Sequence, residues 1–375
     1  MTNKICVYAI CKNESQFVEK WYESMKEADE IVVVDTGSTD DTVERLRACG
    51  VRVFEKTWSP WRFDEPRNYA LDMATDECNI FISTDLDEVL EPGWSIPLKE
   101  KWIDKVHTRA QYKYAWSHTE NGDPARIFYY DKIHSREWRW SYPVHELLTR
   151  NGDCSYSDNE TLNLFNEIYL HHYPDQTKSR GSYLPLLELR VKENPNDDSY
   201  GKLYLAHEYY YRGYYEKCVN FIKENLIPNN TLYSNLELAN IYVFMGDAYA
   251  AMGMDTAAVG AYSQAQVIDP TYRESYLRLA AAANKRQEYY LAIGLIKECF
   301  DKTVRYYNWL EQDDSWNSSP YDILSISYFY IKDYDKAYAN IKKAINFSSL
   351  KDDDRLLLNL KFIEKEYFNK EVNNG

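Results

Sequence analysis

The feature that most constrains the fold is a change of hydrophobic pattern near the middle of the 375-residue chain. In the first part, short apolar runs alternate with segments in which apolar residues recur every three or four positions. In the second part the strand-like runs disappear and only the helical spacing continues. A chain of this length is long enough for two domains, because a typical domain has about 100–200 residues. The sequence therefore predicts an α/β domain followed by an all-α domain.

The first part has the pattern of a parallel sheet. Its apolar runs predict buried strands at residues 5–10, 31–34, 51–54 and 79–83. Helices are expected between them, at residues 15–26, 42–48 and 67–74. Strands that are apolar on both faces and alternate with helices predict a parallel sheet covered on both sides. Ligands of such sheets bind at the carboxyl ends of the strands, where the polar residues of this part gather.

The second part repeats itself. Small, aromatic and proline residues from Gly246 to Pro270 match the 34-residue tetratricopeptide pattern, and Ala292 lies 34 residues after Ala258. Weaker copies precede and follow this stretch, so we expect helical-hairpin repeats with a final helix that covers the last apolar face. The predicted division is 1–175 for the α/β domain, 176–199 for a linker or first helix, 200–350 for the repeats, and 351–375 for a capping helix and tail.

Composition excludes several classes of protein. The formal charge of −15 argues against a general nucleic-acid binder, which needs a basic surface. The seven cysteines form no CxxC pair, and Cys154 is one of this odd number, so reduced thiols are expected. No apolar run approaches the ~20 residues of a membrane span, and the first residues lead into a strand rather than a signal-peptide core. We therefore expect a cytoplasmic protein with no membrane span.

The strongest local signal for chemistry is the pair Asp85 and Asp87, which follows an apolar strand. Strand alternation would point both carboxylates to the same side. Two hard oxygen ligands suit Mg²⁺ or Mn²⁺, and such an ion would offset the charge of a diphosphate leaving group. The alternative is a solvated turn or helix cap, which is our interpretation of the acidic run at residues 352–354.

The first part resembles the family 2 glycosyltransferases of GT-A fold, over about residues 4–175. The resemblance rests on residues 10–14 (Ile-Cys-Lys-Asn-Glu), 34–40 (Val-Asp-Thr-Gly-Ser-Thr-Asp), 67–68 (Arg-Asn) and 85–87 (Asp-Leu-Asp). With tetratricopeptide repeats appended, the chain is similar to a bacterial group that includes the peptide S-glycosyltransferases of glycosylated bacteriocins, of the sublancin type. The resemblance implies a hexosyltransferase that takes sugar from a nucleotide-sugar, most simply a UDP-sugar, and inverts the anomeric carbon.

By position, the resemblance also implies roles for the polar residues at the strand ends. Cys11, Asn13 and Glu14 would line the nucleotide pocket. Asp35 would contact the base or ribose; the alternative is a polar strand terminus. Arg67 would lie near the donor; the alternatives are a surface residue or an internal ion pair. Asp85 would face the ribose or sugar, and Asp87 would bind Mn²⁺ or Mg²⁺.

A second metal ligand and a base are expected from later segments. His171 and His172 follow a strand-like stretch, and alternation allows only one of them to face inward; His172 is favoured, with packing between the domains as the alternative. Transfer with inversion needs a group that accepts the acceptor's proton. Glu146 is the preferred base, with His145 second, because they lie beside aromatic residues; a structural loop is the alternative.

The acceptor is the least determined part. A peptide or protein side chain (Cys, Ser or Thr) is favoured because helical repeats offer a groove for peptides, and they can also form homodimers. A cell-surface glycan precursor is the alternative, and a scaffold with a decayed transferase domain is a third hypothesis. A processive synthase is disfavoured because residues 136–140 (Arg-Glu-Trp-Arg-Trp) lack the glutamine of the Gln-x-x-Arg-Trp motif. A nucleotidyltransferase is disfavoured because no Gly-rich basic loop follows the first strand.

Overall fold

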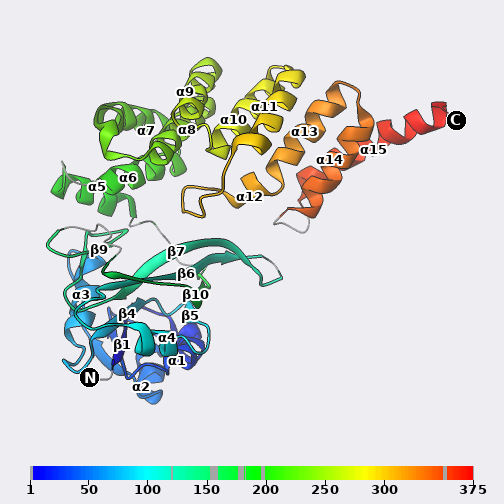
Figure 1. Ribbon diagram of the computed structural model, residues 1–375. Coiled ribbons are helices and arrows are strands. Elements are labelled where there is room, and N and C mark those ends of the chain that lie inside the picture. The colour runs from blue at the N-terminus through cyan, green and yellow to red at the C-terminus, as the bar shows by residue number, and fades with distance from the viewer. Residues whose placement is uncertain are drawn as a thin grey trace. The chain divides into compact units, whose positions relative to one another are not determined.

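The chain folds into two compact units (Figure 1). The computed structural model describes residues 3–119, 121–152, 159–175, 181, 183–195, 199–348 and 353–374. One unit comprises Met1–His118 and Pro124–Asn194, and the other comprises Thr119–Asp123 and Pro195–Gly375. The division after residue 194 lies inside the segment 176–199 that was expected to link the domains. Cys154, Asp352 and parts of that segment lie outside the described residues.

The first unit is built on an eight-stranded sheet with the order β3-β2-β1-β4-β7-β6-β10-β5. Its first four strands in this order pair in parallel, as the alternation of strands and helices predicts. Three of the remaining four joins, β4–β7, β7–β6 and β10–β5, are antiparallel. The strands are β1 (Ile5–Cys11), β2 (Glu30–Asp35), β3 (Arg52–Glu55), β4 (Ile80–Thr84), β5 (Glu88–Leu90), β6 (Arg109–His118), β7 (Pro124–His134) and β10 (Thr161–His172).

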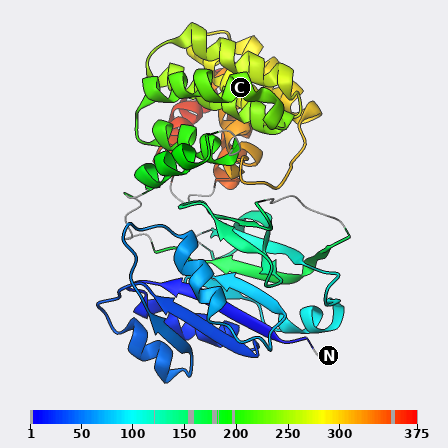
Figure 2. The same ribbon diagram turned by 90° about the vertical axis from the view of Figure 1, so that its left-hand side faces the viewer.

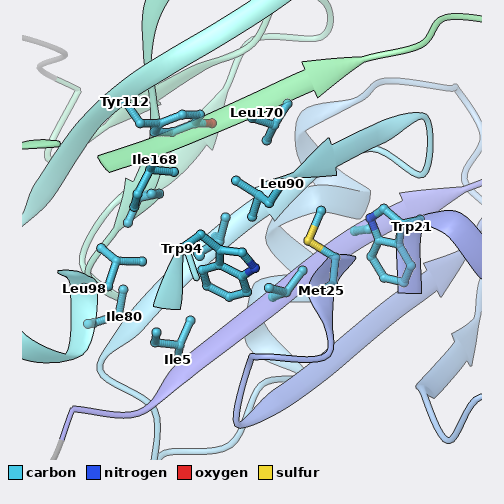
Figure 3. Packing of buried hydrophobic residues seen from close by; sticks show 14 of the residues in the cluster. Ile5, Trp21, Met25, Ile80, Leu90, Trp94, Leu98, Tyr112, Ile168 and Leu170 are labelled. Atoms are coloured by element: carbon cyan, nitrogen blue, oxygen red, sulfur yellow. The ribbon is translucent and has the colours of Figure 1, made fainter. Parts of the chain in front are cut away.

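Buried side chains cover both faces of the sheet. Successive residues of β1 therefore belong alternately to two buried clusters, one on each face. Its odd-numbered residues pack with α1 (Val18–Met25), α2 (Thr42–Ala48) and α4 (Ser95–Lys101). Its even-numbered residues pack with α3 (Asp64–Asp72) and with the hairpin of β8 (Arg139–Ser141) and β9 (Leu147–Thr149). Figure 3 shows the first cluster, in which Trp94 lies among aliphatic residues of the strands and α4. This arrangement leaves the carboxyl ends of β1, β2 and β4 as the polar edge.

The second unit is helical, and its successive helices stack in antiparallel pairs (Figure 2). The helices are α6 (Ser199–Tyr211), α7 (Tyr215–Phe221), α8 (Asn235–Ala251), α9 (Asp255–Ile268), α10 (Arg273–Lys285), α11 (Tyr289–Lys302), α12 (Asp313–Trp316), α13 (Ser319–Tyr330), α14 (Tyr334–Asn346) and α15 (Asp354–Asn374). Short 3-10 or π turns lie at Ser15–Phe17, Ile222–Leu226 and Ile227–Leu232, and α5 (Tyr183–Glu193) belongs to the first unit. A mostly parallel sheet followed by helical hairpins confirms the predicted fold class.

The last helix and the thiols can be compared with the sequence-based expectations. α15 packs against α14, and its Leu356 and Ile363 are buried with Ile341 and Ala344, as expected of a helix that covers the end of a repeat array. Cysteines 6, 11, 49, 78, 218 and 299 are all free thiols. Among the described residues, no helix is long and apolar enough to span a bilayer.

Candidate active site

The ends of β1 and β2 are tied together by a polar turn. The Asp35 carboxylate, which is 2% exposed, accepts hydrogen bonds from the backbone N–H groups of Gly37 (3.0 Å) and Ser38 (2.9 Å) and from the Ser38 hydroxyl. The Cys11 thiol donates to the same carboxylate at 3.6 Å. Asn13 has a positive φ of 52°, and its side-chain oxygen accepts from Thr39 N at 2.7 Å. The carboxylate of Asp35 therefore holds its own turn.

Glu14 begins the helical segment that follows β1. Its backbone N–H donates to the hydroxyl of Thr42 at 2.8 Å, and the residue is 7% exposed. The structure thus places Cys11, Asn13, Glu14 and Asp35 together at the carboxyl edge of the sheet, where a nucleotide would bind.

A buried ion network lies at the carboxyl end of β4. Arg67, from α3, donates through Nε to Glu146 Oε1 at 2.5 Å and through NH2 to Asp85 Oδ1 at 2.8 Å. Burial opposes the charge of the guanidinium, but the two carboxylates outweigh it and raise the pKa of Arg67. Burial likewise opposes the charge of Asp85, yet Arg67 and Lys132 lower the pKa of that carboxyl. Arg67 therefore forms an internal ion pair with each of these two carboxylates.

Sequence reasoning missed Lys132 and Glu88, which extend this network. Lys132 Nζ, on β7, lies 2.7 Å from Glu88 Oε1 and 3.7 Å from Asp85 Oδ2. Glu88 also accepts from the hydroxyl of Tyr114 (2.8 Å) and from the N–H of Asp85 (3.0 Å). Nothing in the sequence indicates that a lysine inside a strand is buried. Glu88, however, directly follows the acidic pair, and this third carboxylate could have indicated that the network is larger. Glu88 holds the backbone of Asp85 in place.

The acidic pair lies in a turn, so strand alternation does not apply to it. β4 ends at Thr84 and β5 begins at Glu88, and the intervening residues form the bend. As a result the two carboxylates have different direct partners. Asp85 bonds to Arg67. Asp87 Oδ2 lies 3.4 Å from His172 Nε2, and the backbone carbonyl of Asp87 accepts a hydrogen bond from Tyr173 N at 2.7 Å.

His172 rather than His171 lies against the acidic pair, and alternation along β10 allows only one of the two to do so. Its Nδ1 lies 3.1 Å from the carbonyl oxygen of Trp116, and the Trp116 ring packs on the imidazole with centroids 4.8 Å apart. Burial lowers the pKa of His172, but the hydrogen bond and the charge of Asp87 outweigh burial, so the pKa is raised. His171 instead bonds to Glu91 (2.9 Å) and to His118 (2.9 Å).

The pair Asp87 and His172 fits a divalent ion. Neighbouring ligands of an ion with bonds of about 2.1 Å are separated by about 3 Å, close to the 3.4 Å between Oδ2 and Nε2. The contact of Nδ1 with a carbonyl leaves Nε2 as the ligand, an arrangement typical of metal-binding histidines. In the described part of the chain, no three His, Cys, Asp or Glu side chains are grouped to hold an ion. Water and donor phosphates would fill the other positions, as is usual for Mg²⁺.

The preferred base, Glu146, lies in the loop between β8 and β9 with a side chain that is 11% exposed. Its carboxylate is bound by Arg67. The neighbouring His145 has a positive φ of 47°, and its ring meets Tyr183 edge-on at 5.6 Å. The structure therefore brings Glu146 into the ion network around Asp85.

Comparison with known proteins matches part of the first unit to a family model. Residues 6–150 match the family model described as glycosyl transferase family 2. An uncharacterized glycosyltransferase of Rickettsia conorii is 44% identical over 59 residues, which are 16% of this chain and 21% of that protein. One from Rickettsia bellii is 42% identical over 59 residues, 16% of this chain and 20% of that protein. The chain thus spans about a fifth of the length of these relatives.

Solved structures of helical-repeat proteins are similar to about half of the chain. A thermophilic TPR protein of Thermus thermophilus is 19% identical, with a TM-score of 0.37, over 48% of this chain and 88% of that one. MamA of Desulfovibrio magneticus is 15% identical, with a TM-score of 0.38, over 47% of this chain and 89% of that one. Likenesses this distant add nothing to the description of the helices given above. The match over residues 6–150 shows that the amino-terminal unit carries a glycosyltransferase domain of family 2.

Proposed function

We propose that this protein is a metal-dependent, inverting glycosyltransferase that moves a single sugar from a nucleotide-sugar, such as a UDP-sugar, to an acceptor. The observation that carries the proposal is the placement of Asp87 and His172 beside the network of Asp85 and Arg67. Asp85, Asp87 and Arg67 lie inside the family 2 match, and His172 follows it. Carboxylates, an imidazole and cations at the carboxyl edge of a parallel sheet suit a diphosphate and its metal ion.

Each group has a distinct role in this proposal. A Mn²⁺ or Mg²⁺ ion on Asp87 and His172 would supply Lewis-acid stabilisation of the departing diphosphate. Arg67 and Lys132 fix the orientation of Asp85, which faces the ribose or the sugar, while Cys11, Asn13, Glu14 and Asp35 line the nucleotide side. These fixed partners keep the site ordered before the donor binds, so less ordering is needed at the moment of reaction.

The base is Glu146, with His145 as the second choice. A carboxylate that accepts an acceptor proton must reach the acceptor atom within about 3 Å, directly or through one water molecule. In the structure Arg67 holds the carboxylate of Glu146 through Nε and Oε1 at 2.5 Å. We infer that Arg67 positions Glu146, and that the second carboxylate oxygen is the one that receives the proton.

The acceptor in this proposal is a peptide or protein side chain, a cysteine, serine or threonine. Two features support it: the resemblance to the bacteriocin S-glycosyltransferases and the helical hairpins of the second unit. A thiol acceptor would need less help from a base, since a thiolate is accessible near neutral pH. The hairpins also suit a homodimer, and we place the enzyme in the cytoplasm.

Calorimetric titration with UDP tests the donor site. We expect saturable binding in the presence of Mn²⁺, and binding weakened at least tenfold without the ion or in Asp87→Asn. Asp76→Asn is the matched control, because this side chain is fully exposed on the same unit. Binding of UDP that is equally tight with and without Mn²⁺ would show that the ion is not part of the donor site. No binding of UDP or GDP under any condition would remove the basis of the proposal.

A further inference from the structure

The helical unit contains a connection that is much longer than the turns of its neighbours. Residues 303–312, called here the connecting segment, join α11 to α12, whereas α8 and α9 are joined by residues 252–254. The connecting segment has no helix or strand. In Figure 1 it runs back beneath α10 toward the earlier helices of the unit. It therefore lies along the first helices of the preceding hairpins.

Fixed side chains of α10 and of the turn before it hold the main chain of this segment. The hydroxyl of Tyr272 donates to the carbonyl of Leu310 at 3.2 Å. Glu274, in α10, accepts from Gln312 N at 2.9 Å. Leu310 is 7% exposed. Because these bonds involve backbone groups of the segment, another peptide could supply the same groups.

An aromatic side chain anchors the other end. The ring of Trp309 packs on Tyr204, with centroids 4.8 Å apart, and meets His207 at 5.9 Å. Both partners belong to α6. The segment thus contacts the first helix of one hairpin through its tryptophan, and α10 through its backbone.

Polar side chains connect these two contact areas across α8. His207 Nε2 lies 2.9 Å from Asn240 Oδ1, and Asn240 Nδ2 donates to the hydroxyl of Tyr272 at 2.9 Å. The residues Tyr204, His207, Asn240, Tyr272 and Glu274, called here the inner row, therefore form one continuous surface over three successive first helices. With the segment in place Asn240 is 2% and Tyr272 1% exposed, and the hydrogen bonds from His207 to Asn240 and from Asn240 to Tyr272 hold the row in one arrangement.

We propose that the inner row is a peptide-docking groove that the chain fills with its own connecting segment. The partner that fits it is a short peptide with an aromatic side chain for Tyr204 and His207, followed by a carbonyl for Tyr272 and an N–H for Glu274. The connecting segment is a pattern for the shape of such a peptide: Glu311 accepts from Tyr306 N at 3.0 Å, which closes it into a compact turn. This inference does not depend on the proposed sugar transfer.

Tethering sets how strongly the segment excludes a competitor. A segment joined to its site by a short linker acts at an effective concentration on the order of millimolar. A free peptide that binds the open groove with a Kd of about 10 µM would therefore bind the closed chain about 100-fold more weakly. A partner displaces the segment only if it binds the groove more tightly than the segment does, or if the partner is itself tethered close to the groove.

The test uses a labelled synthetic peptide of residues 303–313 and the full chain. In one variant, residues 304–311 are replaced by glycine and serine at equal length. We expect saturable binding of the peptide to this variant and much weaker binding to the unaltered chain, by about 100-fold if the Kd for the variant is about 10 µM. A peptide with the change Trp309→Ala is expected to bind at least tenfold more weakly, and a scrambled peptide not at all.

Two results would overturn the proposal. One is a replaced variant that keeps its helix content and Tm but shows no saturable binding; the other is equal affinity for the replaced and the unaltered chain. If the replaced variant does not fold, Trp309→Ala in the full chain decides, because it keeps the backbone bonds of the segment. Peptide binding at least tenfold tighter than to the unaltered chain supports the proposal, and equal affinity contradicts it.

Discussion

The side chain of Lys132, which lies in a strand of the sheet, is only 7% exposed. Its ammonium group is held by Glu88, which is 1% exposed, and lies near Asp85. Burial opposes the charge, but the two carboxylates outweigh it, so the pKa of Lys132 is raised. A buried pair of this kind adds little to stability compared with apolar residues, but removing one partner leaves the other charge uncompensated.

Lys132→Met is therefore expected to lower the free energy of unfolding by about 3–5 kcal/mol, as measured by urea denaturation. The matched control is Lys101→Met, whose partner Glu167 lies on the surface, and we expect a change there of about 0–1 kcal/mol. Equal effects of the two changes would mean that the buried pair with Glu88 does not form in solution.

Glu274 is a second buried charge, and it predicts a pH dependence of stability. Burial raises the pKa of this carboxyl from the usual 4.5 to about 7, so the folded state retains a proton that the unfolded state releases. The contribution of this carboxyl to the free energy of unfolding is complete below pH 4.5. It falls as the pH rises and does not change further above about pH 7. Glu274→Gln, measured by denaturation from pH 4.5 to 8, is expected to gain about 2–3 kcal/mol over the unaltered chain at the high end. A difference that does not change with pH would contradict the raised pKa.

At the scale of residues, the sequence predicted which side chains gather but not how they pair. Asp85, Asp87 and Arg67 were found because short motifs mark them, and His172 because strand alternation separates it from His171. The bond between Arg67 and Glu146 joins residues far apart in the chain, so no local spacing predicts it. Lys132 was missed for the same reason.

At the scale of elements, the closeness of α8 and α9 depends on one glycine. A Cβ added at Gly246 would lie 2.3 Å from the ring of Tyr262, whose hydroxyl is fixed by Asp247 at 2.8 Å. The small residue of the repeat pattern is therefore required by packing rather than by backbone conformation. Both residues belong to the repeat pattern found in the sequence, which marks their positions but not the contact between them.

Gly246→Ala is expected to destabilise the chain by about 1–3 kcal/mol, because the ring cannot move away without breaking its hydrogen bond. Gly260→Ala is the matched control: this glycine is also helical, and nothing lies within 4 Å of an added Cβ. There we expect a gain of up to about 1 kcal/mol from helix propensity. Thermal denaturation of both variants measures the contrast, and a loss of stability in both would refute the role of the ring.

At the acidic pair, the position where the strand ends limits what strand alternation can predict. The apolar run was correctly predicted as a strand, but β4 ends at Thr84, just before the first carboxylate. Alternation holds only while the strand continues, so it does not apply to Asp85 and Asp87. On β10 the strand continues through His172, so there the rule does apply and separates His172 from His171.

At the scale of the whole molecule, the change of hydrophobic period predicts two domains, and the chain divides into two units after residue 194, apart from Thr119–Asp123. Hydrophobic period does not encode an irregular connection, so the return of residues 303–312 along the inner row had no signal in the sequence. The family 2 match likewise covers the first unit alone. Sugar transfer is thus a property to be tested on the site of that unit, in the full chain.

The most direct measurement is the release of nucleoside diphosphate from a set of sugar donors. The full chain would be incubated with Mn²⁺ and, separately, with UDP-glucose, UDP-N-acetylglucosamine, UDP-galactose and GDP-mannose, with Asp87→Ala and the exposed Asp76→Asn in parallel. We predict slow hydrolysis of one donor that needs the ion, is lost in Asp87→Ala and is kept in Asp76→Asn. Release that persists without metal and in Asp87→Ala would contradict a metal-dependent transferase centred on Asp87 and His172.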